Sequence, residues 1–465
     1  MSEIFDTIII GAGLSGLQAA LDLHSAKRSF LVLEARSRVG GKTKSVERTD
    51  GKGIQELGAA WLNDTNQSYV WGYAKRFGLT PVVQNTEGLV AAEDAHGICH
   101  MFPFGELPKF GEAVRSNIVT LRDEVERASL DPETFKEPMC DKLDGLSFEQ
   151  YCTDLGAGPE ALLTARVWSR GTLGQDPCDF SALAYLEVCR GGLGLLNLRY
   201  DGKNGAQYLR LQEGTQSIAN GISKLLPADS IRLNTAVTSI AQSSVNSYTI
   251  TTSGDETFNC RKVILSIPSP AYKNISFDPP LPSPKATYTQ SVRYGTFVKL
   301  ICLFKTPFWK RQGACGLAQS FRGPINHCRD TSVPDQGNFA LTCFLCAEAG
   351  RKWLSLNGDD RIEVVLKQLG SLFGVGFEVV KDEFVDSITS GWTEDPWAGW
   401  GCPFATRPPG LQLGVENASE KGGGLYFVGT EFATDWRGYM EGALRSGKEG
   451  AKQVLADLML ESQLK

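Results

Sequence analysis

The strongest constraint on the fold is a glycine pattern near the start of the chain. Gly11, Gly13 and Gly16 form G-x-G-x-x-G between the apolar, β-branched run 5–10 and residues 14–25, whose leucines recur with helical spacing. The first glycine permits a tight turn, the second lets the backbone approach a pyrophosphate, and the third lets a helix pack on a strand. The sequence therefore predicts a strand–turn–helix unit that binds a dinucleotide at the helix N-terminus.

An acidic residue completes this unit. Glu34 follows a second short apolar run, 30–33, and lies 23 residues after Gly11. A carboxylate at the end of the second strand accepts hydrogen bonds from the ribose hydroxyls of an adenosine. Ser15, in the first helical turn, is the further contact expected here. The alternative is a glycine turn without a ligand, and the pattern alone leaves NAD and FAD both open.

Composition narrows the class of protein. The 465 residues allow about three domain-equivalents at roughly 150 residues each. The net charge of −6 argues against a nucleic-acid partner. No apolar run is long enough for a membrane span, and four histidines argue against a metal site. Twelve cysteines without a signal peptide suggest a reducing compartment, so a cytoplasmic location is expected.

The remaining pattern predicts a discontinuous organisation. Residues 80–204 look mainly helical and loop-like, whereas 288–304 and 339–347 look like strands of a second sheet. Six prolines between Pro268 and Pro284 suggest a crossing between domains. The expected nucleotide-binding domain takes 1–80, 205–270 and 420–465, and the expected substrate-binding domain takes 80–205 and 270–420.

The residues after Glu34 point to a family. The run Glu34–Thr43 reads E-A-R-S-R-V-G-G-K-T, which resembles the E-A-R-x-R-x-G-G-R pattern of the flavin-containing amine oxidases. Lys42 replaces the usual arginine, which keeps the charge and loses the bidentate geometry. The resemblance implies FAD as cofactor and Ala35, Arg36, Gly41 and Lys42 among its contacts. It also implies an α/β fold, with a Rossmann-like FAD-binding domain interleaved with a mixed-sheet plus helical substrate domain.

Further motifs follow in family order and extend the resemblance over residues 8–443. The segment 56–61 resembles the stretch along the flavin, and Val237 the residue whose backbone holds the adenine. Segments 429–431 and 436–443 resemble the C-terminal flavin signature. The FAD contacts that these motifs imply are Gly58, Ala59, Trp61, Val237, Thr430, Glu431, Gly438, Tyr439 and Met440. In character the chain is similar to monoamine oxidases of the soluble fungal type.

The resemblance also assigns catalytic positions. Lys299 lies among apolar neighbours and matches the family lysine that holds a water under flavin N5, where it assists proton movement and reoxidation by oxygen. The alternative is a lysine at a strand edge with its head in water. Tyr439 matches one wall of an aromatic cage, and an aromatic face orients an amine through its quadrupole. The alternative for Tyr439 is core packing.

Cys402 stands eight residues before Gly410, the spacing at which covalent monoamine oxidases carry their flavin-linked cysteine. The resemblance therefore implies a thioether to the flavin 8α position. Pro403 replaces the second cage tyrosine, so Trp400 or Phe404 is expected to supply the other aromatic wall.

The resemblance places the substrate pocket and its entrance near Arg199, Tyr200, Ala206 and Gln207, with a one-residue ambiguity in the alignment. Phe339, Phe344 and the run 327–329 are candidates for the pocket too, but core packing or a surface loop is the expectation for them.

The implied activity is FAD-dependent removal of a hydride from a C–H bond beside nitrogen in a small-molecule amine or N-heterocycle. The product is an imine or iminium, and O2 reoxidises the flavin. One alternative is a biosynthetic oxidocyclase that closes a ring on a larger indole or N-heterocyclic substrate. Another is a non-catalytic escort protein with a flavin fold. No membrane, metal or nucleic-acid partner is expected, and the oligomeric state is not predicted.

Overall fold

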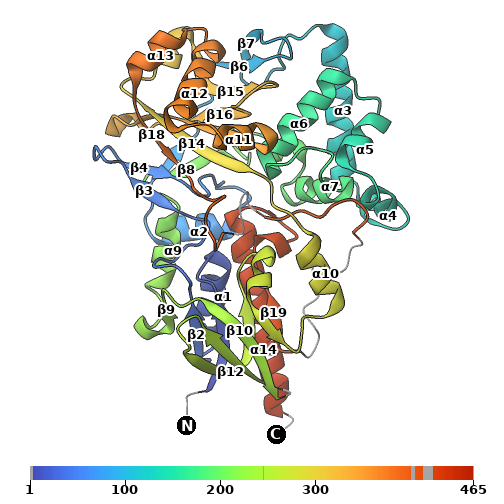
Figure 1. Ribbon diagram of the computed structural model, residues 1–465, viewed down its shortest axis with the longest axis vertical. Coiled ribbons are helices and arrows are strands. Elements are labelled where there is room, and N and C mark those ends of the chain that lie inside the picture. The colour runs from blue at the N-terminus through green and yellow to red at the C-terminus, as the bar shows by residue number, and fades with distance from the viewer. Residues whose placement is uncertain (1–3, 245, 399–403, 412–422, 464–465) are drawn as a thin grey trace.

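The computed structural model describes residues 4–244, 246–398, 404–411 and 423–463. Its strands form an eight-stranded sheet, a seven-stranded sheet and two small pairs. The two large sheets lie towards opposite ends of the long axis, and a group of helices lies beside the seven-stranded sheet (Figure 1). The site described below lies where these three parts meet.

The eight-stranded sheet is built around β1 (Ile4–Ile10), which runs parallel to β2 and β12 on its two sides. The turn after β1 leads into α1 (Leu14–Ser25), as the glycine pattern predicts. Strand order is β13-β10-β11-β12-β1-β2-β9, with β19 also paired to β12. The strands besides β1 are β2 (Phe30–Leu33), β9 (Ile231–Arg232), β10 (Val237–Ser244), β11 (Ser247–Thr252), β12 (Thr257–Leu265), β13 (Ser276–Asp278) and β19 (Leu425–Phe427).

The two faces of this sheet bury different partners because successive side chains of a strand point to opposite faces. Ile9 packs in one cluster with Leu17 of α1 and Leu444 of α14 (Met440–Gln463). Ile8 packs in another cluster with Ile240 and Ile250 of the β10–β11 hairpin. The apolar run that identified β1 in the sequence is therefore buried on both sides.

The seven-stranded sheet has the order β18-β14-β17-β16-β15-β6-β7. Helices α11 (Ala347–Leu354), α12 (Gly358–Leu372) and α13 (Phe377–Glu383) lie close to it (Figure 1). Its strands are β6 (Leu89–Glu93), β7 (Cys99–Pro103), β14 (Phe297–Phe304), β15 (Ala314–Ser320), β16 (His327–Asp330), β17 (Phe339–Cys346) and β18 (Phe384–Thr389).

One expectation about this region was wrong. The strand expected from residue 288 begins at Phe297, and α10 (Ser283–Ser291) precedes it, because Pro284 at the start of the helix fixes a helical φ and needs no donor. Residues 80–204 are mainly helical and loop-like, as expected, and they also contain the antiparallel pair of β6 and β7. Small alanines make this pair too weakly patterned to be identified from the sequence.

The helical part packs around Phe148, Phe180 and Tyr185, which are fully buried. Its helices are α3 (Glu112–Leu130), α4 (Met139–Asp144), α5 (Phe148–Asp154), α6 (Pro159–Leu173), α7 (Ala182–Gly191) and α8 (Leu195–Leu198). The small pairs are β3 (Ser45–Glu47) with β4 (Ile54–Glu56) and β5 (Pro81–Val83) with β8 (Leu209–Leu211), and the other helices are α2 (Ser68–Arg76) and α9 (Gln216–Ser223). Within the described ranges, no helix combines the length and apolar character that crossing a bilayer requires.

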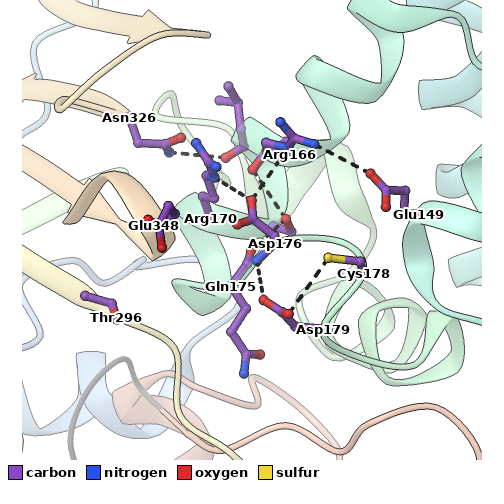
Figure 2. A network of polar contacts seen from close by, with 12 residues as sticks. Glu149, Arg166, Arg170, Gln175, Asp176, Cys178, Asp179, Thr296, Asn326 and Glu348 are labelled. Carbon is purple, nitrogen blue, oxygen red and sulfur yellow. Dashed lines mark hydrogen bonds and ion pairs between the residues drawn. The ribbon is translucent and has the colours of Figure 1, made fainter. Parts of the chain in front are cut away.

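A side-chain hydrogen bond joins this helical part to the seven-stranded sheet. Within the helical part, Arg166 and Arg170 of α6 converge on Asp176 in the loop that follows the helix (Figure 2), with N···O distances of 3.6 and 2.7 Å. Asn326, just before β16, donates from Nδ2 to the carbonyl of Val167 at 3.3 Å. The α6 backbone is therefore fixed against the sheet by a side-chain hydrogen bond.

The eight-stranded sheet draws on three separate stretches of the chain, which lie within residues 4–33, 231–278 and 425–427. Its strand β13 lies beyond residue 270 and pairs with β10 through Ser239 and Ser276. The division into two domains and its boundaries stay a prediction.

Gly447 tests the packing of α14 on α1. A Cβ at Gly447 would lie 2.1 Å from the backbone oxygen of Ser15. We expect Gly447→Ala to lower the free energy of unfolding by about 1–3 kcal/mol through overpacking. The matched control is Gly72→Ala in α2, where a Cβ would meet nothing within 4 Å. Helix propensity should make that variant slightly more stable. Thermal melting of both variants checks the pair, and equal melting temperatures would contradict the packing.

Candidate functional site

A cavity of about 860 Å³ extends from the glycine turn to the seven-stranded sheet and the helical part. The residues predicted from the sequence that line it are Gly11, Gly13, Ser15, Glu34, Ala35, Arg36, Gly41, Lys42, Gly58, Ala59, Trp61, Arg199, Gln207, Val237, Lys299, Phe404, Thr430, Glu431, Gly438, Tyr439 and Met440. Gly16 and Ala206 do not line it, and Trp400 and Cys402 lie outside the described residues. One cavity thus collects residues separated by more than 400 positions.

The glycine turn leaves open space at the N-terminus of α1. Gly11 has a φ of +100°, a conformation that favours glycine. A Cβ at Gly16 would lie 2.1 Å from the oxygen of Gly11, so Gly16 serves the contact between helix and strand. Gly13 lines the cavity, and a Cβ there would meet no protein atom within 4 Å. The space beside Gly13 is the cradle in which a ligand can approach the backbone.

The carboxylate of Glu34 is held at this end of the cavity by backbone donors. Its Oε2 accepts from the N–H of Ala12 at 2.7 Å, and its Oε1 accepts from the N–H of Arg36 at 2.9 Å. The side chain is buried. These bonds fix the direction of a carboxylate that can also accept from a hydroxyl in the cavity.

The basic residues after Glu34 have partners within the protein. Arg36 donates to Asp395 at 2.8 Å. Arg38 donates to the carbonyls of Thr43 and Gly41, and burial lowers the pKa of its guanidinium. Lys42 donates to the hydroxyl of Tyr294 at 2.9 Å. These contacts hold the loop after Glu34 in place, and Arg36 and Lys42 also line the cavity.

The C-terminal motif is tied together by Thr430. Its hydroxyl accepts from the N–H of Gly438 at 2.7 Å and donates to the carbonyl of Tyr439 at 2.9 Å. Glu431 accepts from the N–H of Ser269 at 2.7 Å, and burial raises the pKa of its carboxyl. The segment after β19 and the start of α14 are thereby held as one wall.

The register of the seven-stranded sheet explains the opposite wall. Lys299 of β14 is paired with Phe344 of β17, Phe344 with His327 of β16, and His327 with Gln319 of β15. Residues paired across neighbouring strands project to the same face of a sheet. All four line the cavity, so one face of this sheet forms the wall opposite the glycine turn.

Lys299 is buried, with 5% of its surface exposed. Its Nζ donates to the carbonyls of Glu56 and Gly58, at 2.9 and 2.5 Å, and lies 5.3 Å from the ring centre of Trp61. Burial raises the pKa of the Glu56 carboxyl, and the ammonium of Lys299 opposes this shift. The alternative of a strand-edge lysine with its head in water is wrong, because β14 has β17 on one side and β18 on the other.

Tyr439 stands at the cavity, with its hydroxyl accepting from Nε2 of Gln207 at 3.1 Å. Pure core packing therefore does not describe this ring. Phe404 also lines the cavity, and the guanidinium of Arg437 lies 5.4 Å from its ring centre. The other candidate for the second aromatic wall, Trp400, and the neighbouring Pro403 lie outside the described residues.

Of the residues considered for the substrate pocket, some line the cavity and others do not. Ala206 is fully buried behind the wall, whereas its neighbour Gln207 lines the cavity, which fits the one-residue ambiguity. Phe344, His327 and Arg329 were expected in the core or a surface loop, but they line the cavity. The reason is that 327–330 form strand β16 beside β17. Phe339, at the far end of β17, does not line it.

Sequence reasoning missed Trp168 and Asp201, which also line the cavity. Trp168 belongs to an amphipathic helix and carries no signal that separates a cavity wall from a core. Asp201 is identifiable only through its contact with Arg329, 128 residues away.

Comparisons with known proteins agree on one family. A family model described as flavin containing amine oxidoreductase matches residues 14–455. A flavin-containing amine oxidase of Danio rerio is 29% identical over 466 residues, which cover 98% of this chain and 86% of that protein. A probable flavin-containing monoamine oxidase A of Dictyostelium discoideum is 29% identical over 472 residues, with 100% of both chains covered. Wild-type putrescine oxidase bound to putrescine has the same fold, with a TM-score of 0.90 at 24% identity over 98% of this chain and 100% of that one.

His327 generates a prediction about pH. Burial lowers its pKa well below the usual 6.5, and Arg329 and Arg199 lower it further. Below pH 6.5 the unfolded chain therefore gains a proton that the folded protein does not, so stability is full above this pH and is lost as the pH falls. His327→Gln should reduce the loss between about pH 7.5 and 5.5 by about 1 kcal/mol. Urea unfolding of both proteins at the two pH values measures this, and an unchanged loss would contradict it.

Proposed function

Because the chain belongs to the flavin-containing amine oxidoreductase family, we propose that its cavity binds FAD from the glycine turn to Lys299 and an amine beside Tyr439. The family and the α/β fold predicted from the motifs are confirmed. The observation that carries the proposal is that one cavity joins the dinucleotide motif to the buried lysine and the aromatic side chains.

The donors along the cavity fit an extended dinucleotide. The open space at Gly13 and the N-terminus of α1 suit a pyrophosphate, because the first-turn N–H groups of a helix attract anions. Glu34, held by two N–H donors, suits the ribose hydroxyls of the adenosine. Val237 lines the same end, next to the position expected for the adenine. Trp61, Gly58 and Ala59 extend the lining towards Lys299.

The other end suits the chemistry of amine oxidation. When bound, FAD supplies the acceptor for a hydride from the C–H bond beside the amine nitrogen, with O2 as final oxidant. Tyr439 and Phe404 offer ring faces that orient the amine nitrogen. Lys299 is fixed by two carbonyls and can hold a water or move a proton at Nζ. The product is the imine.

Neither alternative from the sequence is favoured by the comparisons. The relatives are described as amine oxidases, which supports chemistry over a non-catalytic binding protein. They give no indication of ring closure. We therefore retain plain amine oxidation as the proposed activity.

Lys299→Met tests the catalytic end. Removal of the ammonium should leave flavin bound and slow flavin reduction or its reoxidation about 100-fold, within the range of general acid–base effects. Stopped-flow absorbance of the bound flavin and a peroxide-coupled assay over benzylamine, aliphatic amines and tryptamine measure this.

The matched control for that substitution is Lys305→Met, an exposed lysine just beyond β14. It should turn over amines at the wild-type rate. Wild-type rates in Lys299→Met would remove Lys299 from the mechanism. A colourless wild-type protein that releases no peroxide with any amine would contradict the proposed function as a whole.

Cys402 is proposed to hold the flavin through a thioether, on the strength of its spacing to Gly410. After acid precipitation the yellow colour should stay in the wild-type pellet and move to the supernatant in Cys402→Ala. Cys178→Ala, which changes an exposed cysteine, is the control and should keep the colour in the pellet. Colour in the wild-type supernatant would exclude the covalent link and leave FAD binding intact.

A further inference from the structure

The cavity wall formed by β16 and the segment after α8 carries two arginines and one carboxylate. Arg329 donates from Nε to Oδ1 of Asp201 at 2.7 Å, and both side chains are largely buried. Arg199 lines the cavity beside them and is partly buried. The proposed function gives none of these three charged groups a role.

Arg199 differs from Arg329, the other arginine of this wall, in its partners. In the ranges that the structure describes, no oxygen accepts a hydrogen bond from its guanidinium, and no carboxylate forms an ion pair with it. Its guanidinium lies 5.9 Å from the ring centre of Trp168. An arginine has five N–H donors, and burying them without acceptors is unfavourable. A molecule that enters the cavity can supply the missing hydrogen-bond acceptor for Arg199.

The charge balance of the wall indicates which acceptor fits. The Arg329–Asp201 pair is neutral in total, and burial together with the two arginines lowers the pKa of His327, which keeps it uncharged. Gln207 and Gln319 are neutral. The wall thus carries one net positive charge, which matches a singly charged anion better than a dianion.

The wall formed by β16 and the segment after α8 lies close to the proposed reacting end. Gln207 donates both to the carbonyl of Leu198, next to Arg199, and to the hydroxyl of Tyr439. Arg329 lies 5.5 Å from the ring centre of Trp61, and Lys299 lies 5.3 Å from the same centre. One small molecule can therefore reach both the arginines and the aromatic side chains.

We propose that Arg199, beside the Arg329–Asp201 pair, binds a carboxylate of the substrate, so that this enzyme prefers amines carrying one carboxylate. The inference rests on the proposed function for the amine and on the contacts of Arg199 for the carboxylate. A planar guanidinium pairs with a carboxylate through two parallel N–H···O bonds. Its positive charge disfavours an amine that brings only a second positive charge.

Calorimetric titration of the holoenzyme with phenylacetate and phenylacetamide tests this without turnover. These probes have the same ring and differ in the carboxylate, and the wild type should bind phenylacetate about 10- to 100-fold more tightly. Arg199→Met should abolish the preference. Arg199→Lys should retain part of it, because the positive charge remains but the two parallel N–H donors of the guanidinium are lost. The matched control is Arg122→Met, which removes a cavity-lining arginine that already pairs with Asp123, and it should keep the full preference.

Equal affinities for the acid and the amide in the wild type would overturn the inference. A full preference in Arg199→Met would overturn the assignment to Arg199. Should Arg199→Met fail to fold, as judged by its melting curve, an undiminished preference in Arg199→Lys would do the same. A protein that oxidises simple amines without preferring the acid fails only this inference, whereas a colourless protein that prefers the acid fails only the proposed function.

Discussion

The structure depends on close backbone contacts around α1. A Cβ at Gly16 would lie 2.1 Å from the oxygen of Gly11, and one at Gly447 equally close to the oxygen of Ser15. Helix α1 can therefore lie directly between the turn after β1 and α14, with no side chain to hold them apart. This contact directs the N-terminus of α1 into the cavity, and the proposed pyrophosphate site is a consequence of it.

The register of the seven-stranded sheet determines which of its side chains line the cavity. Because Lys299, Phe344, His327 and Gln319 are partners across four neighbouring strands, they form one row on one face. A slip by one residue in any of these strands would turn its member of the row away from the cavity. The chemistry proposed for Lys299 thus requires the whole sheet to keep its register.

Charge is distributed differently at the two ends of the cavity. Near the glycine turn, Glu34, Arg36 and Glu431 each have a defined hydrogen-bond partner within the protein. These contacts hold the wall rigid before any ligand binds. At the far wall, Arg199 has no such partner in the described ranges, which is why we assign it to the substrate. Most buried polar groups in proteins have hydrogen-bond partners, so a buried guanidinium without an acceptor in the protein calls for an explanation.

The sequence by itself determined the family, the β1–α1–β2 unit and most residues that line the cavity near the glycine turn, because glycines and an acidic residue at fixed local spacing dictate backbone shape and are visible without a fold. It did not separate Phe344, His327 and Arg329 from core or loop residues, and it missed Asp201, because their place depends on which strands become neighbours. Only the tertiary structure decided that, among the described residues, no carboxylate pairs with Arg199 while Asp201 pairs with Arg329. Pairing between residues far apart in the sequence depends on their distance in space, and this distance cannot be read from local spacing in the sequence.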